Sequence, residues 1–188
     1  MSSSVSRFLL FIFLAKFLNP STLGLFGLFI STVSLMMLIV GGDFYTYSQR
    51  KIMTLPSSMW HIVIQNQIFA LLIIYFVFFP PQILLFSFNL LPSNLLYWFI
   101  FILLVEHLGQ EINRLLIAIK KPIYASLILF IRTGVWIYFI LFCMYFFPES
   151  RNLENIFYSW LIAASIAILV GMNIIYRSIP IWKFVSID

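Results

Sequence analysis

The sequence predicts an all-α membrane protein, a bundle of about six transmembrane helices, and three observations support this fold class. Hydrophobic residues make up 63% of the 188 residues and charged residues only 9%, with a mean hydropathy of +1.06. A soluble domain carries about 25% charged residues, and one of this size could not bury so much apolar surface. Apolar stretches separated by Pro, Gly and charged residues recur along the chain. We expect one transmembrane domain over residues 1–188.

The same composition excludes several other classes of protein. A chain so rich in hydrophobic residues is not a disordered protein. The net charge is +5, but the basic residues are too few and too dispersed for a soluble nucleic-acid-binding protein. Cys143 is the only cysteine, which leaves neither a disulfide scaffold nor a cysteine metal cluster. We therefore expect the lipid bilayer as a partner, with no nucleic acid and no cofactor.

The first three helices follow from apolar runs and the residues that end them. A transmembrane helix needs about 20 mostly apolar residues. The first helix is short, contains Lys16 and ends at Asn19-Pro20. The second is uncharged up to Gly41-Gly42-Asp43, and the third ends at Pro80-Pro81. The apolar piece at 83–91 is too short to cross the bilayer, and we expect a loop at the membrane interface there.

The last three helices complete the count. The fourth is unusual because charged residues fall inside it. The fifth begins after Lys120-Lys121-Pro122 and carries one charge, Arg132, and the sixth is followed by Arg177. A secretory signal peptide is the alternative for residues 1–18, but no small-x-small cleavage motif follows them. The expected helices cover about 5–18, 22–42, 58–79, 94–119, 123–147 and 153–176.

The distribution of basic residues predicts the orientation. Cytoplasmic loops carry an excess of Lys and Arg. With the N-terminus in the cytoplasm, seven basic residues fall inside and two outside, so we expect both termini to be cytoplasmic. Trp60, Trp98, Trp160 and Trp182 lie near the expected membrane boundaries, as an aromatic belt would place them. The inside residues are Arg7, Arg50, Lys51, Lys120, Lys121, Arg177 and Lys183, and the outside residues are Lys16 and Arg151.

Polar residues gather on one face of the fourth helix. A charged group at the middle of a membrane costs ~2.5–3.5 kcal/mol, so it needs a partner or a wet cavity. At about 100° per residue, six polar side chains fall within an arc of about 160°. We therefore expect this helix to line a wet interior. The six are Glu106, His107, Gln110, Glu111, Asn113 and Arg114.

The fifth helix offers a partner for this face. If the hairpin turns at Lys120-Lys121-Pro122, Glu111 and Arg132 lie at the same depth, near the middle of the bilayer. Two interpretations remain open. The two residues form a buried ion pair that only joins the helices, or they belong to a charged patch inside a transport cavity.

Catalytic and metal-binding motifs are missing from the sequence. There is no Asp-x-Asp, His-x4-Asp, Walker A or His-Glu-x-x-His pattern. His107 and Glu111 have a spacing compatible with metal chelation, but no further good ligand lies near them in sequence. Asp43 is expected to pair with Arg50 or to cap the cytoplasmic turn. We expect no metal site and no enzyme activity.

Four segments resemble a known family of transporters. They are Phe17-Leu18-Asn19-Pro20-Ser21-Thr22-Leu23-Gly24-Leu25-Phe26, the run from Gly42 to Arg50, the stretch from Glu106 to Arg114, and Arg132 to Trp136. They are similar to bacterial polysaccharide (O-antigen) flippases of the multidrug/oligosaccharidyl-lipid/polysaccharide exporter superfamily. Members of that family have two six-helix lobes around a cationic cavity. The chain resembles one N-terminal lobe, and we expect a partial or truncated transporter that pairs with a second lobe or a copy of itself.

The resemblance implies a function and a set of site residues. The function is to flip undecaprenyl-diphosphate-linked oligosaccharide across the bacterial inner membrane for the assembly of surface polysaccharide such as lipopolysaccharide. The implied cations for the substrate's diphosphate are Arg132, Arg114 and Lys16. The implied groups for ion coupling or charge balance are Glu106, Glu111, Asp43 and His107.

Two other functions stay open. One is an inactive remnant or accessory membrane subunit. The other, with less support, is a membrane enzyme of glycan assembly that uses Glu106, His107 or Glu111 as a base. Such enzymes usually carry catalytic groups in a long loop at one face. The longest outer loop, Pro80 to Ser93, has no titratable residue.

Overall fold

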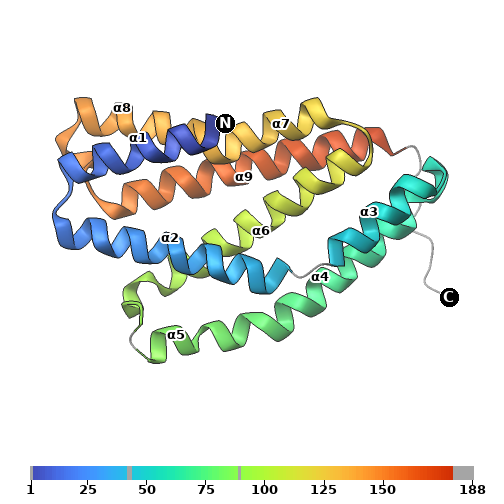
Figure 1. The fold of residues 1–188 in the computed structure, drawn as a ribbon, viewed down its shortest axis with the longest axis horizontal. Helices are drawn as coiled ribbons and strands as arrows, with labels where there is room; N and C mark the ends of the chain where they lie inside the picture. The colour runs from blue at the N-terminus through green and yellow to red at the C-terminus, as the bar shows by residue number, and fades with distance from the viewer. Residues whose placement is uncertain (1, 42–43, 89, 180–188) are drawn as a thin grey trace.

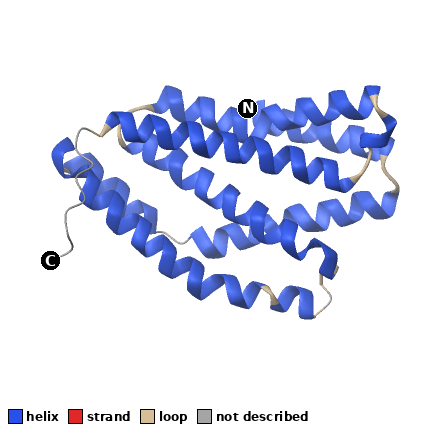
Figure 2. Cartoon of the chain, turned by 180° about the vertical axis from the view of Figure 1, so that it is seen from behind, coloured by secondary structure: helices blue, strands red, loops and turns tan. Residues whose placement is uncertain are grey.

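The computed structural model describes residues 2–41, 44–88 and 90–179, and this part of the chain forms a bundle of helices without strands (Figures 1 and 2). The structure confirms the expected all-α membrane fold class. Five helical stretches of the described residues are long and apolar enough to cross a bilayer, and Phe8–Phe17 is a shorter apolar helix. The number is close to the six expected. The five are Pro20–Gly41, Ser57–Ser87, Ser93–Ala118, Pro122–Phe146 and Leu153–Ser178.

Prolines mark where two of the helices begin. Pro20 is the first residue of α2 and Pro122 is the first residue of α7. An amide at this position makes no hydrogen bond within the helix, so a proline costs none there. Between α6 and α7, Lys120 adopts a φ of 62° in the tight turn. The helices are α1 (Ser2–Phe17), α2 (Pro20–Gly41), α3 (Phe44–Thr54), α4 (Trp60–Gln82), α5 (Leu84–Ser87), α6 (Leu96–Ala118), α7 (Pro122–Phe130), α8 (Trp136–Phe146) and α9 (Leu153–Ser178). Short 3-10 turns at Ser57–Met59, Ser93–Leu95 and Pro148–Ser150 precede α4, α6 and α9.

Helix α6 is central in the bundle. It packs against α2, α3, α7 and α9, and α1 packs against α8. Helices α7 and α8 are one membrane span, joined by a π-helical turn, η3 (Ile131–Val135). Helix α4 lies at the side of the bundle and diverges from α9 (Figure 1). In its most apolar window only 6% of residues are buried, against 28–44% in the other four spans, so α4 is the span least enclosed by protein.

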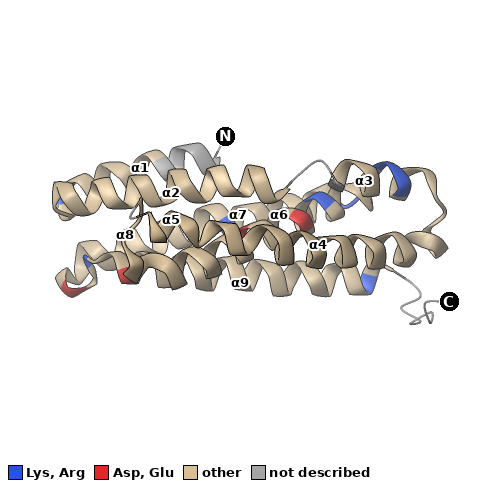
Figure 3. Ribbon diagram, turned by 90° about the horizontal axis from the view of Figure 1, so that it is seen from below, with Lys and Arg blue, Asp and Glu red and all other residues tan. Residues whose placement is uncertain are grey.

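Charged residues lie mainly at the two ends of the bundle, with a few in the middle (Figure 3). The end of α3, the α6–α7 turn and the end of α9 lie together at one end, which we call the basic end (Figure 1). It carries Arg50, Lys51, Lys120, Lys121 and Arg177. The opposite end carries Lys16, Glu149, Arg151 and Glu154. The loops that were expected to share a membrane face therefore do lie at the same end of the bundle.

Two apolar clusters hold the bundle together. The larger one joins α1, α2, α6, α8 and α9 through aromatic side chains, and the rings of Phe29 and Phe157 lie 4.5 Å apart. The smaller one lies toward the basic end and includes Ile52, Leu116 and Ile175. Polar groups of α6 occupy the region between the two clusters.

Three local features differ from the sequence-based expectation. Residues 44–54 form a separate helix, α3, which was not expected. Helix α4 runs through Pro80-Pro81 to Gln82, because a proline near the last turn removes one amide donor while its φ still fits a helix. Beyond it, Leu84–Ser87 of the expected interfacial loop forms the short helix α5.

Candidate functional site

The polar face of α6 points into the protein, as its spacing predicts. Glu106, His107 and Glu111 are all more than nine-tenths buried. Their side chains contact residues of α2, α4, η3 and α9, which cover this part of α6. Asn113 fixes the hairpin by donating from Nδ2 to the carbonyl oxygen of Ala125 on α7, at 2.6 Å.

Glu106 and Arg132 form the deeper of two ion pairs. Arg132 Nη1 lies 3.7 Å from Glu106 Oε2 and donates to the main-chain oxygen of the same residue at 2.7 Å. The other carboxylate oxygen, Oε1, accepts a hydrogen bond from Trp160 Nε1 at 2.6 Å. Gly109 makes room for the arginine, since a Cβ there would lie 2.7 Å from Arg132 Cδ. The buried carboxylate is thus neutralised by a guanidinium and bonded to an indole.

The π-helical turn η3 carries Arg132 in the middle of its membrane span. Such turns are rare and often occur at functional sites. The next residue after the turn, Trp136, stacks on Trp160 with ring centroids 5.3 Å apart and planes at 5°. A small cavity of about 60 Å³ lies beside the two indoles and the Glu106–Arg132 pair. Within the described part of the chain, Trp136 Nε1 has no hydrogen-bond partner.

Glu111 and Arg114 form the second ion pair, one turn apart on α6. Arg114 Nη1 donates to Glu111 Oε1 at 2.7 Å, and Gln67 Nε2 on α4 donates to the other oxygen, Oε2, also at 2.7 Å. The guanidinium carbon of Arg114 lies 3.6 Å from the centre of the Tyr45 ring on α3, a cation–π contact. Gln49 Nε2 donates to the Arg114 main-chain oxygen at 3.1 Å. This cluster ties α3, α4 and α6 together.

His107 joins α6 to α4 at a second point. The Tyr75 hydroxyl lies 2.7 Å from His107 Nδ1, and the two rings meet edge to face with centroids 5.5 Å apart. His107 Nε2 is buried and bonds to none of the described residues. Among the described residues, the Gln67–Glu111 and Tyr75–His107 hydrogen bonds attach α4 to α6.

The expected pairing of Glu111 with Arg132 is wrong. Arg132 pairs with Glu106, and Glu111 pairs with Arg114 and Gln67. Two residues at the same depth in a helical hairpin can still point in different directions around their helix axes. Glu106 and Glu111 are about 140° apart on a helical wheel, so they face different neighbours.

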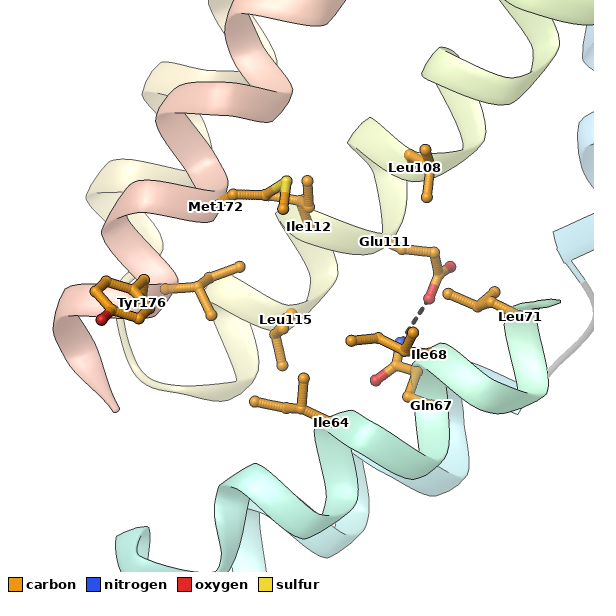
Figure 4. Close-up of a pocket in the computed structure, with 11 residues that line it drawn as sticks. Ile64, Gln67, Ile68, Leu71, Leu108, Glu111, Ile112, Leu115, Met172 and Tyr176 are labelled. Carbon is orange, nitrogen blue, oxygen red and sulfur yellow. Dashed lines mark hydrogen bonds between the residues drawn. The ribbon is translucent and has the colours of Figure 1, made fainter. Parts of the chain in front are cut away.

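Two larger cavities lie beside α6. The first, which we call the polar cavity, measures about 470 Å³ and opens between α2, α3 and α6. Arg114 lines it with a side chain 21% exposed, together with Gln110, Tyr45 and Ser34. The second, which we call the apolar groove, measures about 500 Å³ and lies between α4, α6 and α9 (Figure 4). The Glu111 side chain lies at its edge, where Gln67 bonds to it.

The structure brings together most of the residues expected in the site, but not all. Arg132, Glu106, His107, Glu111 and Arg114 lie in or between the two ion pairs described above. Lys16 is exposed at the opposite end of the bundle, with its ammonium 5.8 Å from the Phe17 ring. Asp43 lies outside the described residues. Among the described residues, no three His, Cys, Asp or Glu side chains gather closely enough to hold a metal ion.

Several partners of these residues were missed by the sequence analysis. Gln67 and Tyr75 were treated as part of an apolar span, although a polar side chain inside such a span is itself a signal of a partner. Trp160 was assigned to the aromatic belt, which is wrong because it is buried and bonded to Glu106. Tyr45, on the unexpected helix α3, had no signal.

No protein-family model, no curated protein and no solved structure matches this chain. The arguments about function therefore depend on the geometry of these residues.

Proposed function

We propose that this chain is a lobe of a membrane transporter that binds an anionic, lipid-linked substrate. One observation carries the proposal: Arg114 lines an open polar cavity next to a membrane-spanning helix, with part of its guanidinium accessible. A guanidinium in such a place can bind an anion, because it carries several N–H donors and Glu111 accepts from only its Nη1. The planar fork of a guanidinium matches the geometry of a phosphate and can bind it through two hydrogen bonds.

The roles of the charged residues follow from their burial. Arg114 is the residue that meets the substrate's diphosphate, with Gln110 and Tyr45 beside it. Glu111 balances the charge of Arg114 when the cavity is empty. When the substrate displaces Glu111 from Arg114, the hydrogen bond from Gln67 stabilises the Glu111 carboxylate. Arg132 and Glu106 are too deeply buried to bind substrate first, so they hold η3 and α9 in position against α6.

The substrate class follows from the resemblance to O-antigen flippases. It is an undecaprenyl-diphosphate-linked oligosaccharide, moved across the bacterial inner membrane without any bond being made or broken, so the chain is not an enzyme. Both termini are cytoplasmic in this proposal. The polar cavity opens at the side of the lobe, and a second lobe or a second copy closes it.

The experiment is a binding and flipping assay in vesicles. The wild type and variants are reconstituted in phosphatidylcholine vesicles with fluorescent undecaprenyl diphosphate, and binding and loss of outer-leaflet signal are measured. Loss of a charged hydrogen-bond donor costs about 1.5–3 kcal/mol, so Arg114→Gln should bind at least about tenfold more weakly. Lys16→Gln removes a cation outside the cavity and is the matched control. Equal binding by the two variants would contradict the proposal.

A structural role for the chain, as an accessory membrane subunit, is the second candidate. It is favoured by the way Glu106, Arg132 and Trp160 satisfy one another in a buried position. In that case Arg114→Gln, together with an uncharged replacement of Glu111, leaves binding and every glycan phenotype unchanged. A double variant is needed because one charge of a pair left alone is destabilising by itself.

A further inference from the structure

The apolar groove has walls from three helices, and none of the residues that the structure describes fills it. Ile64, Ile68 and Leu71 come from α4, Leu108 and Leu115 from α6, and Met172 from α9, and their side chains point toward a common space (Figure 4). The polar groups at its edge, Gln67 and Glu111, bond to each other and so offer little to water. An empty space of about 500 Å³ would leave all these apolar walls without contacts.

The size and position of the groove limit what can fill it. It extends for about 10 Å along the helices, from the basic end toward the middle of the spans, since residues 108 and 115 are seven helical steps apart. One turn of a helix about 10 Å wide and 5.4 Å high occupies roughly 400 Å³, so the groove is too small to enclose two turns of a helix from another chain. A single hydrocarbon chain does fit, and the spans place the groove within the hydrocarbon layer.

The charge at the basic end selects the head group. Tyr176 lines the groove, and the next residue, Arg177, is exposed. Lys120 lies exposed in the turn after α6, five residues beyond Leu115. The described residues at this end include no carboxylate, whereas at the opposite end Glu149 and Glu154 balance the two cations. Basic residues next to a gap between membrane helices attract anionic lipid head groups.

We propose that the apolar groove binds one acyl chain of an anionic phospholipid, whose phosphate lies at Arg177 and Lys120. The site is separate from the polar cavity and does not depend on the proposed transport function. The bound chain replaces the protein contacts that α4 lacks. It fills the space between α4 and the rest of the bundle beside the Gln67–Glu111 hydrogen bond.

The test titrates dioleoyl phosphatidylglycerol or dioleoyl phosphatidylcholine into the purified protein in detergent and counts bound lipid by native mass spectrometry. The two lipids have identical chains and differ in charge. We expect the first phosphatidylglycerol to bind at least about fivefold more tightly than the first phosphatidylcholine. One Lys or Arg near a membrane surface increases the affinity for an anionic lipid by about that factor. Arg177→Gln and Lys120→Gln should each weaken this preference, and the two changes together should remove most of it. Equal binding of the two lipids to the wild type would overturn the anionic assignment.

Two pairs of variants test the groove itself. Ile68 and Ile73 on α4 are 48% and 49% exposed, but only Ile68 lines the groove. Ile68→Trp should abolish the first binding event for both lipids, and Ile73→Trp should leave it unchanged. On α9, Met172→Trp and Leu169→Trp form an equivalent pair, in which Met172 lines the groove. All four positions are exposed enough to tolerate tryptophan, and thermal unfolding checks this.

Two outcomes would overturn the groove as the lipid site. One is undiminished lipid binding by both groove variants. The other is a protein dimer in the wild-type spectrum that disappears in the groove variants, which would assign the groove to a second copy of the chain.

Discussion

Replacing Arg132 with alanine should destabilise the protein far more than replacing Arg132 and Glu106 together. The single change leaves the Glu106 carboxylate buried with Trp160 Nε1 as its remaining side-chain donor. Removing one partner of a buried ion pair costs about 3–5 kcal/mol. In a chain of this length each kcal/mol lowers the melting temperature by about 2–4 °C, so we expect a decrease of about 10 °C.

The double variant Glu106→Gln with Arg132→Met should recover most of this loss. The glutamine Oε1 can still accept from Trp160 Nε1, and a methionine fills the space beside Gly109 that the arginine stem occupies. Replacing a buried ion pair by uncharged groups of similar volume is often nearly neutral. We expect the double variant to unfold within about 1 kcal/mol of the wild type.

The assay is thermal unfolding in one detergent, followed by tryptophan fluorescence, with the free energy of unfolding from a denaturant titration. The single variants Glu106→Gln and Arg132→Met, with the double variant that combines them, form a thermodynamic cycle that isolates the interaction of the pair. Arg50→Ala, at an exposed arginine outside both proposed sites, is the control and should change little. The reasoning would be refuted if Arg132→Ala and the double variant unfolded at the same temperature.

Three further predictions concern packing, the attachment of α4 and orientation. Gly171→Ala should destabilise the bundle by about 1–3 kcal/mol in the same unfolding assay, because its Cβ would collide with Ile112 of α6. Tyr75→Phe should cost about 1 kcal/mol and increase hydrogen exchange in α4, because it removes the hydrogen bond to His107. In a cysteine-free background, a cysteine replacing Lys51 should react with a membrane-impermeant maleimide only from the cytoplasmic side, and one replacing Arg151 only from the outside.

Each of these has a matched comparison. Gly24→Ala is the control for packing, since a Cβ at Gly24 meets nothing within 4 Å, and an equal effect of the two glycine changes would contradict the packing argument. Tyr97→Phe is the control for Tyr75, because Tyr97 is 73% exposed, and unchanged exchange in α4 would show that the hydrogen bond does not hold it. Labelling of both cysteines from one side would reject the expected topology.

The sequence predicted the fold class because membrane spans depend on composition and length, which can be counted. It also predicted that Glu106, His107 and Glu111 face the interior, because their spacing along α6 determines this without reference to other helices. The partners of these residues could not be predicted in the same way. Whether Arg132 meets Glu106 or Glu111 depends on how α7 and α8 are rotated against α6, and no pattern within one helix contains that angle.

Two other features of the fold were not predicted from the sequence, for related reasons. Residues 44–54 are too polar for a membrane span, and their helix depends on packing against α4 and α6. The π-helical turn contains Arg132, Thr133 and Gly134, and these residue types do not by themselves distinguish a π-helical turn from another irregularity in the helix. Its formation depends on contacts with α6 and α9 that place Arg132 over Gly109.

The π-helical turn also determines where this span can change in length. In a regular α-helix, deleting one residue rotates everything after it by about 100° relative to what precedes it. A deletion in α8 would carry the residues beyond it off their packing faces. The turn at Ile131–Val135 already accommodates one residue more than an α-helix of the same rise needs. Removing Thr133 would let the turn become α-helical while Trp136 and the rest of α8 keep their contacts. The α7–α8 span can therefore lose one residue at this turn without rotating α8 relative to the rest of the bundle.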